Sequence, residues 1–230
     1  MLHSTEFERI ANQSTSVTPI EVKNSPKAVR LLLEINHSGG SMQALFYPEK
    51  GIKFSIDTRI PKPWEAYHQA AYYQLAKMLG WKIAIPTVPF SLDADEKGVL
   101  SPYFTEATTQ PHYFYESITP NTTWLQIAAL DYIAGLVDRT SNDILWLPND
   151  QVVVTDNGLS FVEGVEFSTQ ISVIRKAMRG ICLPAEIMQA VSLITAQKLD
   201  MLSPLLFSPD TAIQSIIARR DRILAEQQVL

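Results

Sequence analysis

The first half of the chain alternates β-type apolar runs with polar turns. Residues 18–22 and 42–48 are strand candidates, and the second of these ends at a proline. Residues 28–36, AVRLLLEIN, are apolar and compatible with a strand, although their leucines would equally suit a helix. The sequence HSGGS that follows them is a hairpin turn signal. The opening is therefore interpreted as strand, polar loop, strand, turn, strand.

A helix is predicted over residues 63–80, with Pro63 at its start and Gly80 as its stop. Two further strands, over residues 82–92 and 98–104, flank the acidic turn DADEKG. The second half changes character. Apolar periodicity predicts helices over 122–137, 171–180, 184–202 and 208–228, with Thr123 as the N-cap of the first.

Together these elements predict an α+β protein with two lobes. A β-rich lobe with one helix covers residues 1–107, and a helical lobe with one embedded hairpin covers residues 108–230. Tyr72, Tyr73 and Trp124 are expected in the core. His68 and His112 lack metal-ligand spacing and are expected at the surface or in local hydrogen bonds.

Composition narrows the function classes. The net charge of −5 and the pI of 5.4 argue against a broad nucleic-acid surface. No stretch is apolar and long enough to span a bilayer, and the N-terminal residues lack a signal-peptide pattern, so a cytoplasmic protein is expected. A single cysteine, Cys182, excludes an internal disulfide and a cysteine-based zinc site. Its apolar surroundings predict a buried side chain.

Two Asp-centred motifs bracket the predicted hairpin. Asp138-Arg139 precedes its first strand and Asp156-Asn157-Gly158 follows its second, while Pro148-Asn149-Asp150 supplies the turn. A hairpin does not need a carboxylate at each open end, and two carboxylates brought together resemble a divalent metal and phosphate site. Each motif also has a structural interpretation. An Asp-Arg pair at a helix end is typical of a cap or a surface ion pair, and Asp-Asn-Gly is typical of a turn.

The order of the elements is that of a protein-kinase-like fold. The hairpin region resembles the atypical kinase superfamily that includes phosphoinositide lipid kinases, HipA-like toxins and secretory-pathway Golgi kinases. Their motifs read LDxxIGNxDRHxxN and DxGLxF, where this chain has LDYIAGLVDRTSND and VTDNGLSF. The tail ARRDRILA resembles the closing helix of small bacterial members. The resemblance runs from about Thr18 to Leu224, and the joint order and spacing of the motifs favour it more than any single motif does.

The resemblance implies roles for four residues. Asp138 would be the catalytic base, and Asp156 and Asp143 would hold Mg²⁺ or Mn²⁺ against the phosphates of ATP. The family has Asn where this chain has Asp143, so the preceding Asn142 is the alternative metal ligand. A carboxylate is a good ligand for a hard cation, so the change is compatible with metal binding.

A second departure concerns the nucleotide-binding cation. The third strand in the family carries YKP or FKP, but this chain has FYP, so Tyr47 stands where the lysine belongs. The helix glutamate that would pair with the lysine corresponds to Gln69. Because both partners have lost their charge together, a remodelled site is expected. Substitute groups are available, with Glu65 one turn before Gln69 and three lysines near the predicted phosphate-covering loop and third strand: Lys23, Lys27 and Lys53.

Three hypotheses follow. The first is a kinase-like ATP-binding protein that transfers phosphate to a hydroxyl of an unknown protein or small molecule; a lipid acceptor is least favoured, since no basic amphipathic helix is visible. The second is a pseudokinase that acts as a binding or regulatory module. The third is a structural α+β scaffold without a nucleotide site. The first two predict that Asp138, Asp143 and Asp156 converge on a cleft between the lobes.

Overall fold

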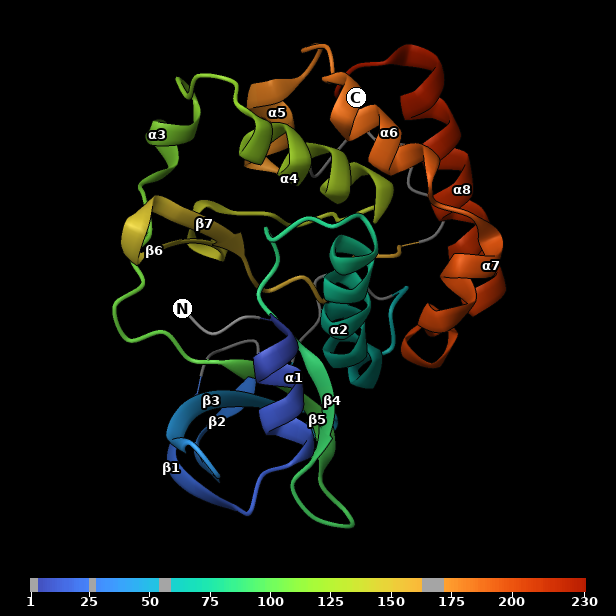
Figure 1. Ribbon diagram of the computed structural model, residues 1–230. Coiled ribbons are helices and arrows are strands. Elements are labelled where there is room, and N and C mark those ends of the chain that lie inside the picture. The colour runs from blue at the N-terminus through green and yellow to red at the C-terminus, as the bar shows by residue number, and fades with distance from the viewer. Residues whose placement is uncertain (1–3, 25–27, 54–58, 163–171) are drawn as a thin grey trace.

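The computed structural model describes residues 4–24, 28–53, 59–162 and 172–230. A five-stranded sheet forms one end of the molecule and a group of helices forms the other, with helix α2 (Lys62–Met78) between them (Figure 1). The predicted α+β class and its two lobes are thus confirmed. The exact division at residues 107 and 108 stays a prediction.

The sheet has the strand order β1-β2-β3-β5-β4, and every neighbouring pair is antiparallel. Its members are β1 (Ser16–Asn24), β2 (Val29–His37), β3 (Gly40–Pro48), β4 (Val88–Ser91) and β5 (Lys97–Pro102). The leucine-rich segment is therefore a strand, and the hairpin turn falls within HSGGS as predicted. Strand β4 is shorter than the predicted 82–92, because Ala84 forms a bridge with Val154 outside the sheet.

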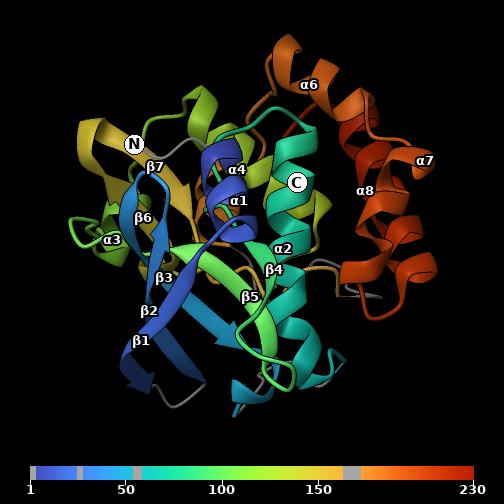
Figure 2. The same ribbon diagram turned by 60° about the horizontal axis from the view of Figure 1, so that its bottom comes forward.

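The two faces of the sheet are covered by different helices. Ala44 and Phe46 of β3 lie in one apolar cluster with Phe7 and Ile10 of helix α1 (Ser4–Asn12), a helix that the sequence analysis did not predict. The alternate residue Tyr47 joins the larger cluster around α2, as the two-residue period of a strand requires. The second half of β3 is therefore buried on both faces of the sheet, with α1 lying against one of them (Figure 2).

Helix α2 connects the sheet to the helical lobe. Pro61 precedes it and Pro63 lies in its first turn, where a missing backbone N–H costs nothing. It is followed by Gly80, whose φ of +73° is the left-handed conformation that favours glycine after a helix. The helix contacts β3, β4 and β5 on one side and the 3₁₀ helix η4 (Asp200–Leu205) on the other. Its side chains are consequently buried on nearly every face.

The helical lobe is built around α4 (Thr122–Ile133), which is apolar all round and buried accordingly. Asn121, rather than the predicted Thr123, caps this helix, because its side chain accepts a hydrogen bond from the backbone N of Trp124 at 3.1 Å. Helices α5 (Val173–Met178) and α8 (Pro209–Glu226) pack against it.

Two further predictions in this lobe were wrong. The single helix over 184–202 is instead α6 (Ala185–Ser192), α7 (Ala196–Leu199) and the start of η4. The break occurs because the Thr195 side chain accepts from Lys198 N and so starts a new helix. Cys182 is exposed rather than buried. A short helix that was not predicted, α3 (His112–Tyr115), precedes α4.

The predicted hairpin is present as β6 (Ile144–Leu147) and β7 (Gln151–Val154). It is flanked by the 3₁₀ turn η2 (Ser141–Asp143), and its strands are joined by η3 (Pro148–Asp150). The segment after α2 bonds to β7 through Ile85 N to Val154 O at 3.0 Å and Val154 N to Ile83 O at 2.7 Å. The segment after β5 bonds to β6, since Thr108 and Trp146 exchange two backbone hydrogen bonds. The segment between α2 and β4 and the connection between the lobes after β5 are therefore both attached to one hairpin.

His68 joins α2 to two parts of the helical lobe. Its Nδ1 lies 2.8 Å from the Ser160 carbonyl oxygen, and its Nε2 accepts a hydrogen bond from Phe207 N at 3.4 Å. This arrangement uses both ring nitrogens of a neutral imidazole that is protonated at Nδ1. The side chain is buried, and burial lowers the pKa of His68 to about 4. The expectation of a histidine at the surface or in local hydrogen bonds was wrong, because His68 is buried and both of its partners are distant in the sequence.

The buried imidazole predicts acid sensitivity. Between about pH 6.5 and 4, His68 is protonated in the unfolded chain but stays neutral in the folded chain. The free energy of unfolding therefore falls as the pH drops through this range. We expect His68 to account for a loss of roughly 2–3 kcal/mol in the free energy of unfolding between about pH 7 and 4.5. Urea denaturation at the two pH values measures it. The stability gap between wild type and His68→Gln should narrow at the lower pH, whereas exposed His112→Gln should follow wild type. A constant gap would contradict the prediction.

Candidate active site

The segment that carries Asp138 leaves the end of α4 through a constrained turn. Gly135 has a φ of +61°, and a Cβ placed there would overlap the guanidinium of Arg219 from α8. Only glycine fits both conditions. The same guanidinium donates to the carbonyl oxygens of Ile133 at 3.4 Å and Val162 at 2.8 Å. Helix α8 therefore fixes the chain at the end of α4 and at the end of the Asp-Asn-Gly segment.

The two Asp-centred segments are bonded to each other along their backbones. Val137 N donates to Leu159 O at 3.2 Å, and Phe161 N donates to Ala134 O at 2.6 Å. Thr155 N also donates to Asp143 O at 2.9 Å, which closes the open end of the hairpin. These bonds hold the segment before β6 against the segment after β7, so that Asp138 and Asp156 line one cavity.

Arg139 holds this arrangement from beneath. Its side chain and that of Asp131 are fully buried, and the two form an ion pair of 2.8 Å. Arg139 also donates to the Thr155 carbonyl oxygen at 2.6 Å and to Asn157 Oδ1 at 2.7 Å. The Tyr72 hydroxyl donates to Asp131 Oδ1 at 2.6 Å. Arg139 of the Asp138-Arg139 motif is thus a buried structural link that pairs with Asp131, rather than part of the surface ion pair considered from the sequence.

Electrostatics keep this network charged. Burial by itself lowers the pKa of Arg139, but the charge and hydrogen bond of Asp131 together with the nearby Tyr72 and Asp143 outweigh burial, so the pKa is raised. Burial and the Asp131 charge both raise the pKa of Tyr72, so its phenol stays neutral and remains a donor. An unpaired charge in this position would be costly, because water does not reach it.

The Asp-Asn-Gly segment is strained and closely packed. Asp156 has a φ of 53°, an uncommon left-handed conformation for a residue other than glycine. Such strain persists where the surroundings impose it, and it concentrates at functional sites. A Cβ on Gly158 would lie 2.6 Å from the Glu65 carbonyl oxygen of α2, so no larger residue fits. The segment is therefore more constrained than a simple turn requires.

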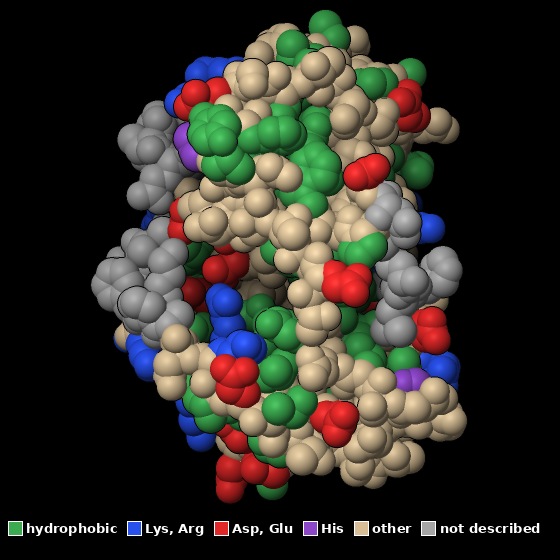
Figure 3. All heavy atoms as spheres, turned by 90° about the vertical axis from the view of Figure 1, so that its left-hand side faces the viewer, with side chains coloured by type: hydrophobic (Ala, Val, Ile, Leu, Met, Phe, Trp, Pro, Cys, Tyr) green, Lys and Arg blue, Asp and Glu red, His purple; other side chains and the backbone are tan. Residues whose placement is uncertain are grey.

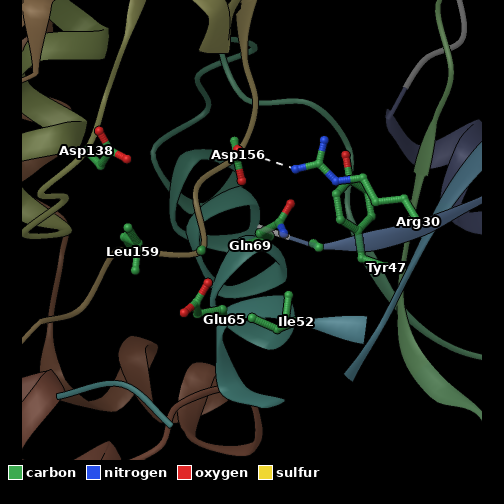
Figure 4. Close-up of a pocket in the computed structure, with 10 residues that line it drawn as sticks. Arg30, Tyr47, Ile52, Glu65, Gln69, Asp138, Asp156 and Leu159 are labelled. Carbon is green, nitrogen blue, oxygen red and sulfur yellow. Dashed lines mark hydrogen bonds and ion pairs between the residues drawn. The ribbon is translucent and has the colours of Figure 1, made fainter. Parts of the chain in front are cut away.

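Asp138 and Asp156 line a small cavity of about 40 Å³ between the lobes. Strands β2 and β3 and helix α2 supply much of the opposite wall, including Arg30, Tyr47 and Gln69 (Figure 4). A hollow is visible between the two halves of the molecule, with acidic side chains above basic ones at its edge (Figure 3). Five residues that the sequence analysis singled out therefore line this one cavity: Asp138, Asp156, Tyr47, Gln69 and Glu65.

Arg30 is the cavity residue that the sequence analysis missed. Its guanidinium lies 4.7 Å from the centre of the Tyr47 ring and donates to Asp156 Oδ2 at 3.3 Å. The side chains of Arg30 and Asp156 are 28% and 40% exposed, so the pair contributes about 0–1 kcal/mol to stability. A signal was present in the sequence. Extending the β2–β3 register by one residue from Leu31↔Phe46 places Arg30 opposite Tyr47.

The other predicted cations lie elsewhere. Lys23 pairs with Glu21 at 3.1 Å and lies over the ring of Tyr103, and it is not among the described residues that line the cavity. Lys53 donates to Asn24 Oδ1 at 3.2 Å. Lys27 lies outside the described residues. Among the described lining residues, Arg30 is thus the one with a positive charge.

Asp143 and Asn142 lie beside the cavity rather than on its wall. Asp143 Oδ2 accepts hydrogen bonds from Thr140 N at 2.7 Å and from Thr140 Oγ1 at 2.8 Å. Burial raises the pKa of Asp143, the nearby negative charge of Asp156 raises it further, and Arg139 opposes both. Asn142 is exposed on η2. Asp143 is therefore close enough to Asp156 for the two carboxylates to repel each other electrostatically.

The oxygen ligands available here suit a hard divalent cation. Among the described residues there is no group of three or more acidic, histidine or cysteine side chains arranged to hold a metal. Magnesium commonly takes only one or two carboxylates, with water and substrate phosphates completing its shell. Arg30 already places a positive charge at the Asp156 carboxylate. Asp156, with Asp143 nearby, therefore fits a metal that arrives with a phosphorylated ligand.

Comparison with known proteins supports the fold. No family model and no curated protein matches the sequence. The structure of hydra Fam20 with sugar matches with a TM-score of 0.63 and 14% identity over 98% of this chain and 89% of that one. The Helicobacter pylori proinflammatory kinase CtkA matches with a TM-score of 0.51 and 10% identity over 93% of each chain. At these identities the likeness shows the fold alone, and that fold is atypical kinase-like.

The buried ion pair yields a stability prediction. Arg139→Met leaves the Asp131 carboxylate buried without its cation, so we expect a loss of about 3–5 kcal/mol in the free energy of unfolding. Arg9→Met, which removes an exposed arginine from α1, should change it by less than about 0.5 kcal/mol. Chemical denaturation of both variants measures the difference. Equal effects would show that the network does not support the fold.

Proposed function

We propose that this chain binds ATP together with Mg²⁺ or Mn²⁺ in the cavity between its lobes and transfers the terminal phosphoryl group to a hydroxyl acceptor. One observation carries the proposal. Two carboxylates from the segments that flank the hairpin at its open end, Asp138 and Asp156, line one cavity that also contains a guanidinium from the sheet. Phosphoryl transfer depends on this combination of a base, a metal-binding carboxylate and a phosphate-binding cation.

Each residue has a chemical role in this proposal. Asp138 accepts the proton of the acceptor hydroxyl while the hydroxyl oxygen forms a bond to the γ-phosphorus and the bond to ADP breaks. Asp156 and Asp143 would hold the metal, which would supply positive charge against the phosphates when bound. Arg139, which follows Asp138 in the chain, bonds to Thr155 and Asn157 on either side of Asp156 and so positions Asp156 relative to Asp138. The acceptor is a hydroxyl of a protein or a small molecule.

A second function, that of a pseudokinase, is favoured by specific observations. Tyr47 and Gln69 are both buried and neutral where related proteins carry an ion pair. The cavity of about 40 Å³ is also well below the roughly 300–1,000 Å³ of typical small-molecule sites. Nucleotide binding therefore requires Arg30 and the lobes to move apart. In a pseudokinase, Arg30 and Tyr47 would instead fill the cleft permanently, and the chain would act as a binding or regulatory module.

Ligand titration distinguishes these functions. We expect ATP with Mn²⁺ to bind in calorimetry and to stabilise the fold by about 2.7 kcal/mol at a hundredfold excess over Kd. Asp156→Asn should abolish most of that stabilisation, since the metal loses its main carboxylate. Asp138→Asn should keep binding but lose phosphate release. Asp150→Asn, on the exposed turn between β6 and β7, is the matched control and should behave as wild type.

The outcomes separate cleanly. Binding with turnover supports the phosphotransferase, and binding without turnover supports a nucleotide-binding regulatory module. If wild type binds neither ATP nor ATP with a metal, the proposal is wrong and the structural scaffold is favoured. If Asp156→Asn unfolds without any ligand, Asp156 has a structural role instead.

A further inference from the structure

Arg30 lies in the cleft with part of its hydrogen-bonding capacity unused. One terminal nitrogen donates to Asp156 Oδ2 at 3.3 Å, and the guanidinium stacks over Tyr47. The Nε atom is buried, and no hydrogen-bond partner for it exists among the residues that the structure describes. A buried donor without an acceptor is costly unless a ligand supplies one. In Figure 4 the guanidinium points from β2 toward Asp156 across the cavity.

We propose that Arg30 supplies the phosphate-binding cation of this chain, and that it leaves Asp156 for the phosphates when metal and nucleotide enter together. The inference rests on the proposed function and identifies the residue that makes it work without the family's lysine. The cation is carried by β2 rather than by β3, where the family has its lysine. Tyr47, at that lysine position, instead provides the ring on which the Arg30 guanidinium stacks.

The neighbouring residues suit this role. Burial raises the pKa of Tyr47, which keeps the phenol neutral beneath the guanidinium. A neutral aromatic ring attracts a cation on its face without competing for its hydrogen bonds. Gln69 is also neutral, so Arg30 is not held by a helix carboxylate in the way that the family's lysine is. The planar guanidinium offers five donors, which suits phosphate oxygens better than a lysine ammonium would.

The contact with Asp156 is weak enough to exchange. Its 3.3 Å length exceeds the roughly 2.7–2.9 Å of strong charge-assisted hydrogen bonds, and both side chains are partly exposed. The Arg139–Asp131 pair, by contrast, is 2.8 Å long and fully buried. Of these two arginine pairs in the site, the one facing the cavity is therefore the one that can open.

Charge balance explains why metal and nucleotide should enter together. The described cavity wall carries three acidic side chains, Glu65, Asp138 and Asp156, against one cation, Arg30. Free ATP is strongly anionic and meets a net negative wall, so it binds poorly without a metal. A metal alone must displace Arg30 from Asp156. Together, the metal occupies Asp156 while the released guanidinium binds phosphate.

The test uses this competition. Arg30→Gln removes the cation but keeps a polar side chain that packs on Tyr47. We expect the affinity for ATP with Mn²⁺ to fall by about 10- to 100-fold, as for the loss of a charged hydrogen bond. Binding of Mn²⁺ alone, measured from the free-ion EPR signal, should instead tighten, because its competitor is gone. Lys97→Ala removes an exposed cation from β5 and should leave both affinities unchanged.

A second experiment moves the positive charge from position 30 to position 47. Arg30→Gln combined with Tyr47→Lys and Gln69→Glu rebuilds the family's ion pair and should recover nucleotide affinity. If wild type binds ATP with Mn²⁺ and Arg30→Gln binds it equally well, the inference about Arg30 is wrong while the proposed function stands. Weaker nucleotide binding without tighter Mn²⁺ binding would overturn the exchange of partners. If wild type does not bind at all, the proposed function itself fails.

Discussion

Arg139 carries a positive charge into a part of the molecule that water does not reach, and Asp131 on α4 holds the counter-charge. The remaining donors of the guanidinium go to Thr155 O and Asn157 Oδ1, on the far side of the hairpin. One side chain thereby connects the core helix, the segment with Asp138 and the segment with Asp156. Because each partner would be costly to leave unpaired, the three cannot shift independently.

Two arginines at this site show how burial decides a role. Arg139 is enclosed and fully bonded, so it acts as a fixed link. Arg30 is partly exposed, has a weaker bond and carries a donor, Nε, that has no partner among the described residues, so it is available to a ligand. A guanidinium therefore fixes the structure at Arg139, whereas at Arg30 it can change its partner when a ligand binds. The positions of Tyr47 and Gln69 fit this division, since neither offers Arg30 a competing carboxylate.

The elements that sequence analysis predicted well are those with strong local signals. The β2–β3 hairpin follows from its turn, and α4 follows from an apolar run that no strand of ordinary length would need. Helix α1 was missed because a helix of 9 residues owes its stability to packing. Phe7 and Ile10 rest on the sheet, and Glu8 bonds to Tyr73 and Lys77 of α2.

The site shows a similar division. Spacing in the sequence pointed to Asp138 and Asp156, because a hairpin is a local structure that brings its own ends together. Arg30 was overlooked because its place in the cleft follows from strand register, and the search for a cation considered lysines near loops. The burial of Arg139 depends on a partner in α4, although a lone Asp131 within an apolar helix was itself a sign that a buried cation was needed.

The attachment of the α2–β4 segment and of the inter-lobe connection to the β6–β7 hairpin has a mechanical consequence. The chain segments around Ile83–Ile85 and Thr108 are each hydrogen-bonded to this hairpin. If the sheet rotates relative to the helices, these bonds place the hinge axis of that rotation along the hairpin. Points near such an axis move least. Asp138 and Asp156, at the base of the hairpin, would stay in place in such a motion, while Arg30 would move with the sheet that carries it.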